Sequence, residues 1–242
     1  MATITQPPRE RLLEAAAELL TTEGELSTRA VCEAAGVGPP TLYHHFGDKE
    51  GLIEAAVERA YESNLARKRA RRPTADAVDD VRRGWDEHVD FARRHPAFYR
   101  LMYAVADARS APTEPMREAR AILLREIRRI AEAGRLRVEP DLAAEVIHTA
   151  VRGVGGQVSS KQPLENAGAV NDLIRKAVLG ALFAAPEADG AAAAGESEAA
   201  RHALALTELA RSGASGLSAA EAALLDEWLR RIVAANRREK DR

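Results

Sequence analysis

The chain has few of the residues that mark an oxidising compartment, a membrane or a β-rich fold. Its single cysteine, Cys32, cannot form an intrachain disulfide, so we expect a buried, reduced thiol. Aromatic residues make up only 4% of the 242 residues and alanine is abundant, which favours helices over strands. No apolar run approaches the ~20 residues that span a bilayer, and the N-terminus lacks the apolar core of a secretion signal. We therefore expect a helical, cytoplasmic protein with no membrane partner.

Signatures of catalysis are also missing. The sequence has no glycine-rich phosphate loop, no GxSxG motif, no paired cysteines and no histidines at metal-ligand spacing. We therefore expect no enzyme activity, no cofactor and no bound metal. The formal net charge of −2 excludes a uniformly basic nucleic-acid-binding protein, but a few local cations are enough to contact DNA phosphates.

Residues 26–46, LSTRAVCEAAGVGPPTLYHHF, carry a distinctive pattern of small and apolar residues. Ser27 or Thr28 can cap a short helix with a side-chain oxygen. Gly36 lies just past that helix and suits the positive φ that often follows a helix end. The segment therefore predicts a short helix, a tight turn and a second short helix.

The second helix of this pattern has two distinct faces. Leu42 and Phe46 are four residues apart and share one face, so the opposite face presents Pro40 and His44. A small, polar and aromatic helix of this size fits the major groove of DNA. The pattern therefore predicts a DNA-reading helix-turn-helix.

The segment AGVGPPTLYHHFGDKEGL resembles the signature of the TetR family of bacterial transcriptional repressors. The matching residues are Gly36, Val37, Thr41, Leu42, Tyr43, His45, Phe46, Lys49 and Glu50. The likeness covers roughly residues 9–60 and extends further only through the helical pattern. It implies an all-α fold, with an N-terminal three-helix helix-turn-helix DNA-binding domain and a larger helical domain for ligand binding and dimerisation.

The resemblance also implies which side chains contact DNA. The implied phosphate contacts are Thr28, Tyr43 and Lys49. The implied base-edge contacts are Arg29, Pro40, Thr41 and His44. Pro39 and Pro40 would meet thymine methyl groups by apolar contact. For His45, which lies closer to the buried face, a packed and hydrogen-bonded histidine is the better interpretation.

One departure from the family signature affects the start of the second helix. Gly38 stands at the usual serine position, and Pro39 and Pro40 remove two backbone N–H donors from the first turn. Because a residue before proline disfavours the α region, we expect Pro39 at the cap position and Pro40 as the first helical residue. The alternative is that the two prolines only stiffen the turn.

Helical periodicity and composition divide the chain into parts. We expect the DNA-binding domain in residues 1–48, a connecting helix at about 48–72, and the ligand-binding and dimerisation domain in 73–185. Thr74 is expected to open a helix of that larger domain. The basic run at the end of the connecting helix, residues 67–72, is interpreted as a solvated face.

The C-terminal part changes character. Small and acidic residues at 186–200 predict a flexible linker. Residues 201–242 predict a C-terminal helical extension, in which Ser218 and Glu221 form a capping box. This extension could dock on the body of the protein, serve as an extra dimer arm or bind a partner, and we favour docking.

The resemblance implies a small-molecule effector, and periodicity suggests residues that could contact it. The candidates are Trp85, His88, Phe98, Met102, Tyr103, Met116, His148 and Arg152. Together they would suit an amphipathic or aromatic ligand. Structural explanations are favoured for the polar candidates: His88 as a hydrogen-bonded core histidine, and His148 and Arg152 as part of a salt-bridged or solvated stripe.

The last helices of the larger domain carry an assembly signal. From Val170 to Leu182, apolar residues repeat at helical spacing and form a seam that needs a partner. The preceding helix contains Gly153, Gly155 and Gly156, which either allow close helix packing or break the helix near its end. The resemblance implies a two-fold homodimer through these helices, which would read a palindromic operator.

The sequence therefore predicts a homodimeric repressor that leaves double-stranded operator DNA when an unidentified small-molecule effector binds. The alternative is a helical small-molecule sensor or partner-binding protein with weak or no DNA binding.

Overall fold

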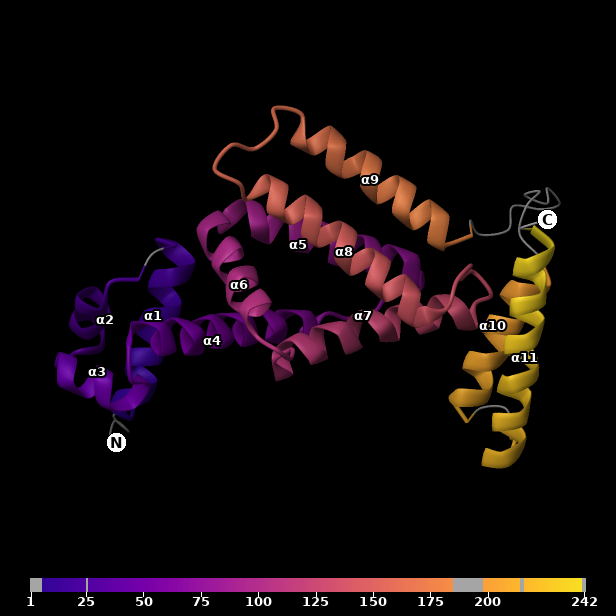
Figure 1. Cartoon of the computed structure of the whole chain (residues 1–242), viewed down its shortest axis with the longest axis horizontal. Helices are drawn as coiled ribbons and strands as arrows, with labels where there is room; N and C mark the ends of the chain where they lie inside the picture. The colour runs from indigo at the N-terminus through magenta and orange to yellow at the C-terminus, as the bar shows by residue number, and fades with distance from the viewer. Residues whose placement is uncertain (1–5, 25, 185–197, 214–215, 241–242) are drawn as a thin grey trace. The chain divides into compact units, whose positions relative to one another are not determined.

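The computed structural model describes residues 6–24, 26–184, 198–213 and 216–240. Within them the chain forms helices and an isolated β-bridge between Leu136 and Phe183, which confirms the all-α expectation (Figure 1). The helices are α1 (Pro8–Thr22), α2 (Thr28–Ala35), α3 (Pro39–Phe46), α4 (Lys49–Ala70), α5 (Ala77–Arg94), α6 (Pro96–Ala108), α7 (Glu114–Glu132), α8 (Pro140–Val158), α9 (Ala167–Leu182), α10 (Glu198–Arg211) and α11 (Ala219–Lys240). Among these helices, none is long and apolar enough to cross a membrane.

The contacts within the chain define two compact units. The first unit comprises Met1–Arg72, Asp86–Ala119 and Gly153–Ala167. The second unit comprises Pro73–Trp85, Arg120–Arg152 and Gly168–Arg242. Helices α5, α7 and α8 each contribute residues to both units.

The first unit is built around α1, which packs against α2, α3, α4 and α6. Leu12, Val31, Leu42 and Leu52, one from each of α1 to α4, are fully buried in its core. Nδ1 of His95, the residue before α6, donates a hydrogen bond of 2.9 Å to the carbonyl oxygen of α1 residue Thr21. The start of α6 is therefore tied directly to the end of the first helix.

A buried carboxylate organises the start of α5 in the second unit. Asp80 is 1% exposed and accepts hydrogen bonds from the Thr74 N–H at 2.9 Å and the Arg129 guanidinium at 2.9 Å. The prediction that Thr74 opens this helix is wrong, because Thr74 instead uses its N–H and hydroxyl to hold Asp80. Asp76 caps the helix by accepting the Val78 N–H at 2.9 Å, and α5 begins at Ala77.

Helices α10 and α11 form a hairpin (Figure 1). The predicted capping box is confirmed, because the Ser218 N–H donates to Oε2 of Glu221 at 2.9 Å and the Glu221 N–H donates to Oγ of Ser218 at 3.4 Å. Of the predicted linker, residues 186–197 lie outside the described residues, and residues 198–200 begin α10. Leu229 of α11 is buried, whereas Leu224 and Trp228 remain exposed.

Candidate nucleic-acid interface and interior cavity

Helices α2 and α3 form the predicted helix-turn-helix. Oγ of Ser27 caps α2 by accepting the Ala30 N–H at 3.4 Å, and Gly36 follows the helix with φ 63° and ψ 40°. Side chains with a Cβ rarely adopt this left-handed conformation, so glycine turns the chain here. Cys32 is buried in α2, as expected, and burial raises the pKa of its thiol. A raised pKa favours the protonated thiol at neutral pH, which is consistent with a packing role.

Helix α3 begins one residue earlier than predicted. Gly38 is extended, with φ −82° and ψ 157°, and is the N-cap, whereas Pro39 and Pro40 are the first two helical residues. The prediction of Pro39 as cap and Pro40 as first helical residue is therefore wrong. Both prolines are tolerated because the N–H groups of a first helical turn have no intrahelical partner. The Thr41 N–H, which donates to the Gly38 carbonyl at 3.0 Å, begins the helical hydrogen bonds.

One face of α3 is open to solvent. Pro39, Pro40, Tyr43 and His44 are exposed, Tyr43 by 49%, and Thr41 is half-buried. Hydroxyl and imidazole groups on this face can donate to phosphate oxygens, and they can donate to or accept from base edges. The face therefore offers the polar and apolar contacts that a groove-reading helix needs.

The opposite side of α3 faces the core. His45 and Phe46 are half-buried, and their rings lie edge to face with centroids 6.4 Å apart. The Arg9 guanidinium lies over the Phe46 ring at 5.4 Å from its centroid. This packing supports the expectation that His45 is a structural residue.

The remaining predicted DNA contacts come from the ends of the neighbouring helices. Thr28 begins α2 and is half-buried, and Lys49 begins α4 and is exposed. Arg29 is exposed and forms an ion pair of 2.9 Å with Glu33 one turn along the same helix. Arg29 must exchange this carboxylate for DNA if it makes its predicted contact, and all eight predicted contacts stay predictions.

The turn from α3 to α4 depends on a glycine that the sequence pattern did not single out. Oδ1 of Asp48 caps α4 by accepting the Gly51 N–H at 2.7 Å. A Cβ on Gly51 would overlap the backbone carbonyl oxygen of Phe46. Glycine at this position therefore allows the end of α3 to approach α4 closely, which sets the direction of the exposed α3 face.

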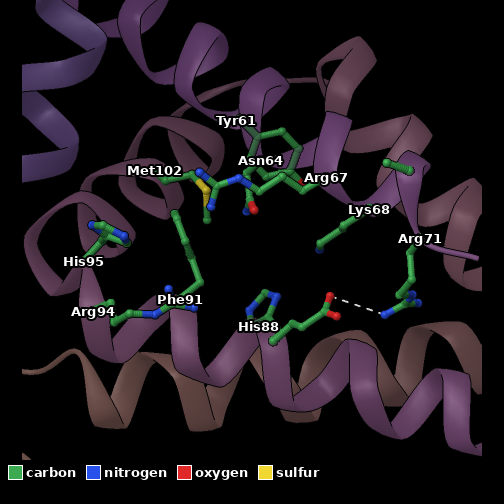
Figure 2. Close-up of a pocket in the computed structure, with 12 residues that line it drawn as sticks. Tyr61, Asn64, Arg67, Lys68, Arg71, His88, Phe91, Arg94, His95 and Met102 are labelled. Carbon is green, nitrogen blue, oxygen red and sulfur yellow. Dashed lines mark hydrogen bonds and ion pairs between the residues drawn. The ribbon is translucent and has the colours of Figure 1, made fainter.

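The first unit also contains a cavity of about 410 Å³ beside α4, α5 and α6 (Figure 2). Its lining residues are Tyr61, Asn64, Arg67, Lys68, Ala70, Arg71, Glu87, His88, Phe91, Arg94, His95 and Met102. A second cavity of about 410 Å³ lies against α1 and shares Asn64, Arg67, Phe91 and His95 with the first. The volumes lie in the range of small-molecule sites.

Some of the predicted ligand residues meet at these cavities. His88 and Met102 line the first cavity, and Phe98 lines the second. Nε2 of His88 lies 2.9 Å from the hydroxyl oxygen of Tyr99, whose ring centroid is 4.9 Å from that of Tyr103. His88 is therefore both hydrogen-bonded in the core, as the structural explanation holds, and part of the cavity wall.

The other predicted ligand residues lie elsewhere. Trp85 is buried in the second unit, where its Nε1–H donates to Oδ1 of Asn171 at 2.9 Å. His148 is exposed and Arg152 is half-buried on α8, and Met116 is half-buried on α7. Their contacts with a ligand stay predictions.

The cavity wall includes cations that sequence reasoning placed in solvent. The interpretation as a solvated face is wrong for Lys68 and Arg71, which are half-buried. It holds for the exposed Arg67, Arg69 and Arg72, although Arg67 also lines the cavity. A signal was present, because Tyr61, Asn64 and Lys68 recur at i, i+3 and i+7 and so share one face of α4. Arg71 follows directly after the helix as its C-cap.

Comparisons with known proteins agree with the helix-turn-helix. Residues 12–56 match the family model described as bacterial regulatory proteins, tetR family. The HTH-type transcriptional regulator UidR of Escherichia coli (strain K12) is 44% identical over 71 residues, which are 28% of this chain and 36% of the relative. The match thus spans about a third of that curated relative's length.

Solved structures extend the likeness beyond the N-terminal segment. One, described as the molecular basis for control of antibiotic production by bacterial hormones, has a TM-score of 0.54 at 26% identity and covers 76% of this chain and 100% of its own. A putative TetR-type regulator from Streptomyces avermitilis has a TM-score of 0.50 at 25% identity and covers 73% and 98%. Residues 12–56 therefore form a helix-turn-helix domain of the TetR type, and the helical fold around it is similar to that of TetR-type regulators.

Proposed function

We propose that the protein is a homodimeric, DNA-binding transcriptional repressor that a small-molecule inducer releases from a palindromic operator. Residues 1–48 would bind DNA and α4 would connect them to a ligand-binding and dimerisation domain at 73–185, followed by the linker and the C-terminal extension. A DNA-binding role places the protein in the bacterial cytoplasm, which holds the DNA. The protein would act by binding rather than by catalysis.

The observation that carries this proposal is the exposed face of α3. Pro40, Tyr43 and His44 are held outward by a core that includes the fully buried Leu42. Folding alone does not require an aromatic hydroxyl and an imidazole to be exposed together on one short helix. Contact with a DNA groove and its phosphates accounts for both groups.

Exposed apolar side chains of α8 and α9 support the dimer. In α9, Leu182 is buried and Ile174 is half-buried, whereas Leu173 on the other side of the helix is 71% exposed. Leu142 of α8 is also exposed. A second copy that covered these side chains would remove apolar surface from water, at about 25 cal/mol per Å².

Release by a ligand follows from linkage. A small molecule weakens DNA binding only if it binds more tightly to the conformation that fits DNA less well. The cavity beside α4 is suited to this role, because α4 begins directly after α3 and packs on α1. The cavity identifies a candidate inducer site, separate from the DNA-contacting face.

The direct test is fluorescence anisotropy with labelled DNA from the region flanking the protein's own gene, compared with a scrambled duplex of equal length. We expect tighter binding to the native duplex and a steep loss of affinity between about 50 and 200 mM salt. Binding with no sequence preference and little salt dependence would contradict the repressor function and favour a sensor or partner-binding protein.

A further inference from the structure

The cavity beside α4 has an unusual balance of charge. Its lining contains four cationic side chains, Arg67, Lys68, Arg71 and Arg94, and one carboxylate, Glu87. A cavity for an uncharged ligand needs only a few polar groups to orient it. The excess of positive charge therefore calls for a specific explanation.

Two of the four cations form ion pairs with carboxylates of this chain. Arg71 forms an ion pair of 3.3 Å with Glu87, and Arg94 forms an ion pair with Asp90 one turn back on α5. These two guanidinium groups are matched by carboxylates within the same unit. These two cations therefore need no bound anion to balance their charge.

The other two cations are not matched in this way. Within the described part of the chain, neither Arg67 nor Lys68 forms an ion pair. Burial lowers the pKa of Lys68, and the neighbouring Arg71 lowers it further, while Glu87 opposes the shift. Keeping an ammonium group half-buried without an ion pair is costly, so the arrangement suggests that a bound anion completes it.

Beside the charged groups and the polar Asn64, His88 and His95, the wall includes apolar and aromatic side chains. Figure 2 shows Lys68 and Arg67 extending from α4 toward the space that Phe91 enters from α5. Met102 is buried in the same wall. Burial raises the pKa of Tyr61, so its hydroxyl stays protonated and can donate a hydrogen bond. A carbon skeleton can therefore be covered on one side while its charged end meets the cations.

We infer that this cavity binds a small organic anion, with Lys68 and Arg67 contacting its carboxylate, sulfonate or phosphate group and Phe91, Tyr61 and Met102 contacting an apolar or aromatic body. As a statement about the inducer, this inference rests on the proposed function. The sequence predicts an amphipathic or aromatic ligand, and the cavity adds that this ligand carries a negative charge.

The test compares two fluorescent probes that differ in charge. 8-Anilinonaphthalene-1-sulfonate carries a sulfonate, and N-phenyl-1-naphthylamine has the same aromatic groups without it. Fluorescence titration of the full chain should give an affinity for the sulfonate about tenfold or more above that for the neutral amine, as expected for a charge-assisted contact. Equal affinities, or no binding of either probe, would overturn the inference.

Matched variants locate the effect. Lys68→Met keeps the apolar stem and removes the charge, so it should weaken sulfonate binding about tenfold and leave the neutral amine within about twofold. Arg93→Gln removes an exposed cation of α5 that is not among the lining residues, and it should change neither affinity. Equal losses in both variants would show a non-specific charge effect and contradict the inference.

Thermal unfolding distinguishes a ligand-binding role of Lys68 from a role in folding. Because Lys68→Met removes a half-buried charge without an ion pair, the variant should unfold at the wild-type temperature or above it. A lower unfolding temperature together with weaker binding of both probes would assign Lys68 to folding and overturn the inference. Inorganic phosphate should displace the sulfonate only weakly, and displacement as strong as that by unlabelled naphthalene-1-sulfonate would exclude the apolar contacts.

Anisotropy on the same samples separates the two proposals. Lys68 lies outside the DNA-contacting face, so Lys68→Met should bind DNA like the wild type. Probe binding needs no DNA. If the wild type bound the probe but no DNA, the repressor function would be refuted and the inferred anion site would still stand.

Discussion

The ring of Tyr99 lies so close to Gly155 that a Cβ at position 155 would overlap the Tyr99 hydroxyl oxygen. A Cβ on Gly153 or Gly156 would meet nothing within 4 Å. The Tyr99 hydroxyl also contacts Nε2 of the cavity residue His88 at 2.9 Å. The close contact with Tyr99 within the same chain therefore explains why position 155 is a glycine. Helix α8 continues past all three glycines to Val158 and does not break at them.

Replacement of Gly155 by alanine should therefore lower stability. The added methyl forces the buried Tyr99 to move, and overpacking of this kind costs about 1–3 kcal/mol. Gly156→Ala is the matched control and should be neutral or gain up to about 1 kcal/mol, because alanine favours a helix interior and has free space here. Urea unfolding of both variants checks the prediction, and equal effects would refute the close contact.

Substitutions on the exposed face of α3 should fall into two groups: those that weaken binding to every DNA sequence and those that change sequence preference. Tyr43→Phe removes a hydroxyl predicted to contact phosphate, so binding should weaken by about 1 kcal/mol on every duplex. Thr41→Ala and His44→Ala should each cost about 1–3 kcal/mol on some sequences and less on others. Anisotropy across a panel of single-base operator variants distinguishes the two patterns, and uniform losses from all three would contradict the assignment.

The cap of α4 should matter more for stability than the cap of α2. Asp48 accepts the Gly51 N–H at 2.7 Å, whereas Ser27 accepts the Ala30 N–H at 3.4 Å. An acidic cap also interacts favourably with the positive end of the helix dipole, so Asp48→Ala should cost about 1 kcal/mol or more. Ser27→Ala should cost less in the same unfolding experiment, and the reverse order would show that cap geometry does not govern these helix starts.

Asp80 should make the protein sensitive to acid. Burial raises its pKa, but hydrogen bonds from Arg129, Thr74 and Arg83 outweigh this and hold the pKa below its ordinary value. The stabilisation from the ionised carboxyl is therefore present above the ordinary carboxyl pKa of about 3.9 and is lost as pH falls toward the lowered one.

Asp80→Asn should accordingly destabilise the protein by about 3 kcal/mol near pH 7 and flatten the loss of stability on acidification. Asp79→Asn is the control, because Asp79 is exposed and its ion pair with Arg82 is expected to contribute less than about 1 kcal/mol. Unfolding temperatures from pH 7 to pH 3 test both. Parallel curves for the wild type and Asp80→Asn would refute the role of the ionised carboxyl.

The proposed dimer surface should be sensitive to charge at Leu173. Leu173→Asp places a carboxylate on a 71% exposed position of α9, so it should leave the fold intact and shift the protein toward monomer in sedimentation equilibrium. Leu164→Asp, at an exposed position before α9, is the control and should keep the association state of the wild type. An unchanged association state in Leu173→Asp would argue against assembly through this face.

Local sequence rules determined much of the DNA-binding part. Oγ of Ser27 caps α2, Gly36 takes the positive φ, and Leu42 is buried opposite the exposed His44, all as expected. These features depend on residues within one or two helical turns of each other. The position of Pro39 was mispredicted, because the effect of a proline on the residue before it did not prevent Gly38 from serving as an extended cap.

The cavity and the buried contacts could not be read from local pattern. Lys68 belongs to a run of cations that suggests solvent, and only the packing of α5 beside α4 makes it part of a wall. Gly155 resembles a helix breaker until Tyr99, 56 residues earlier in the chain, is placed against it.

The sequence by itself determined the helix-turn-helix, because capping, turn conformation and helical periodicity act over a few neighbouring residues. Only the tertiary structure decided which charges are buried, which glycines are required and where a cavity lies, because burial and close approach depend on residues that are distant in the chain.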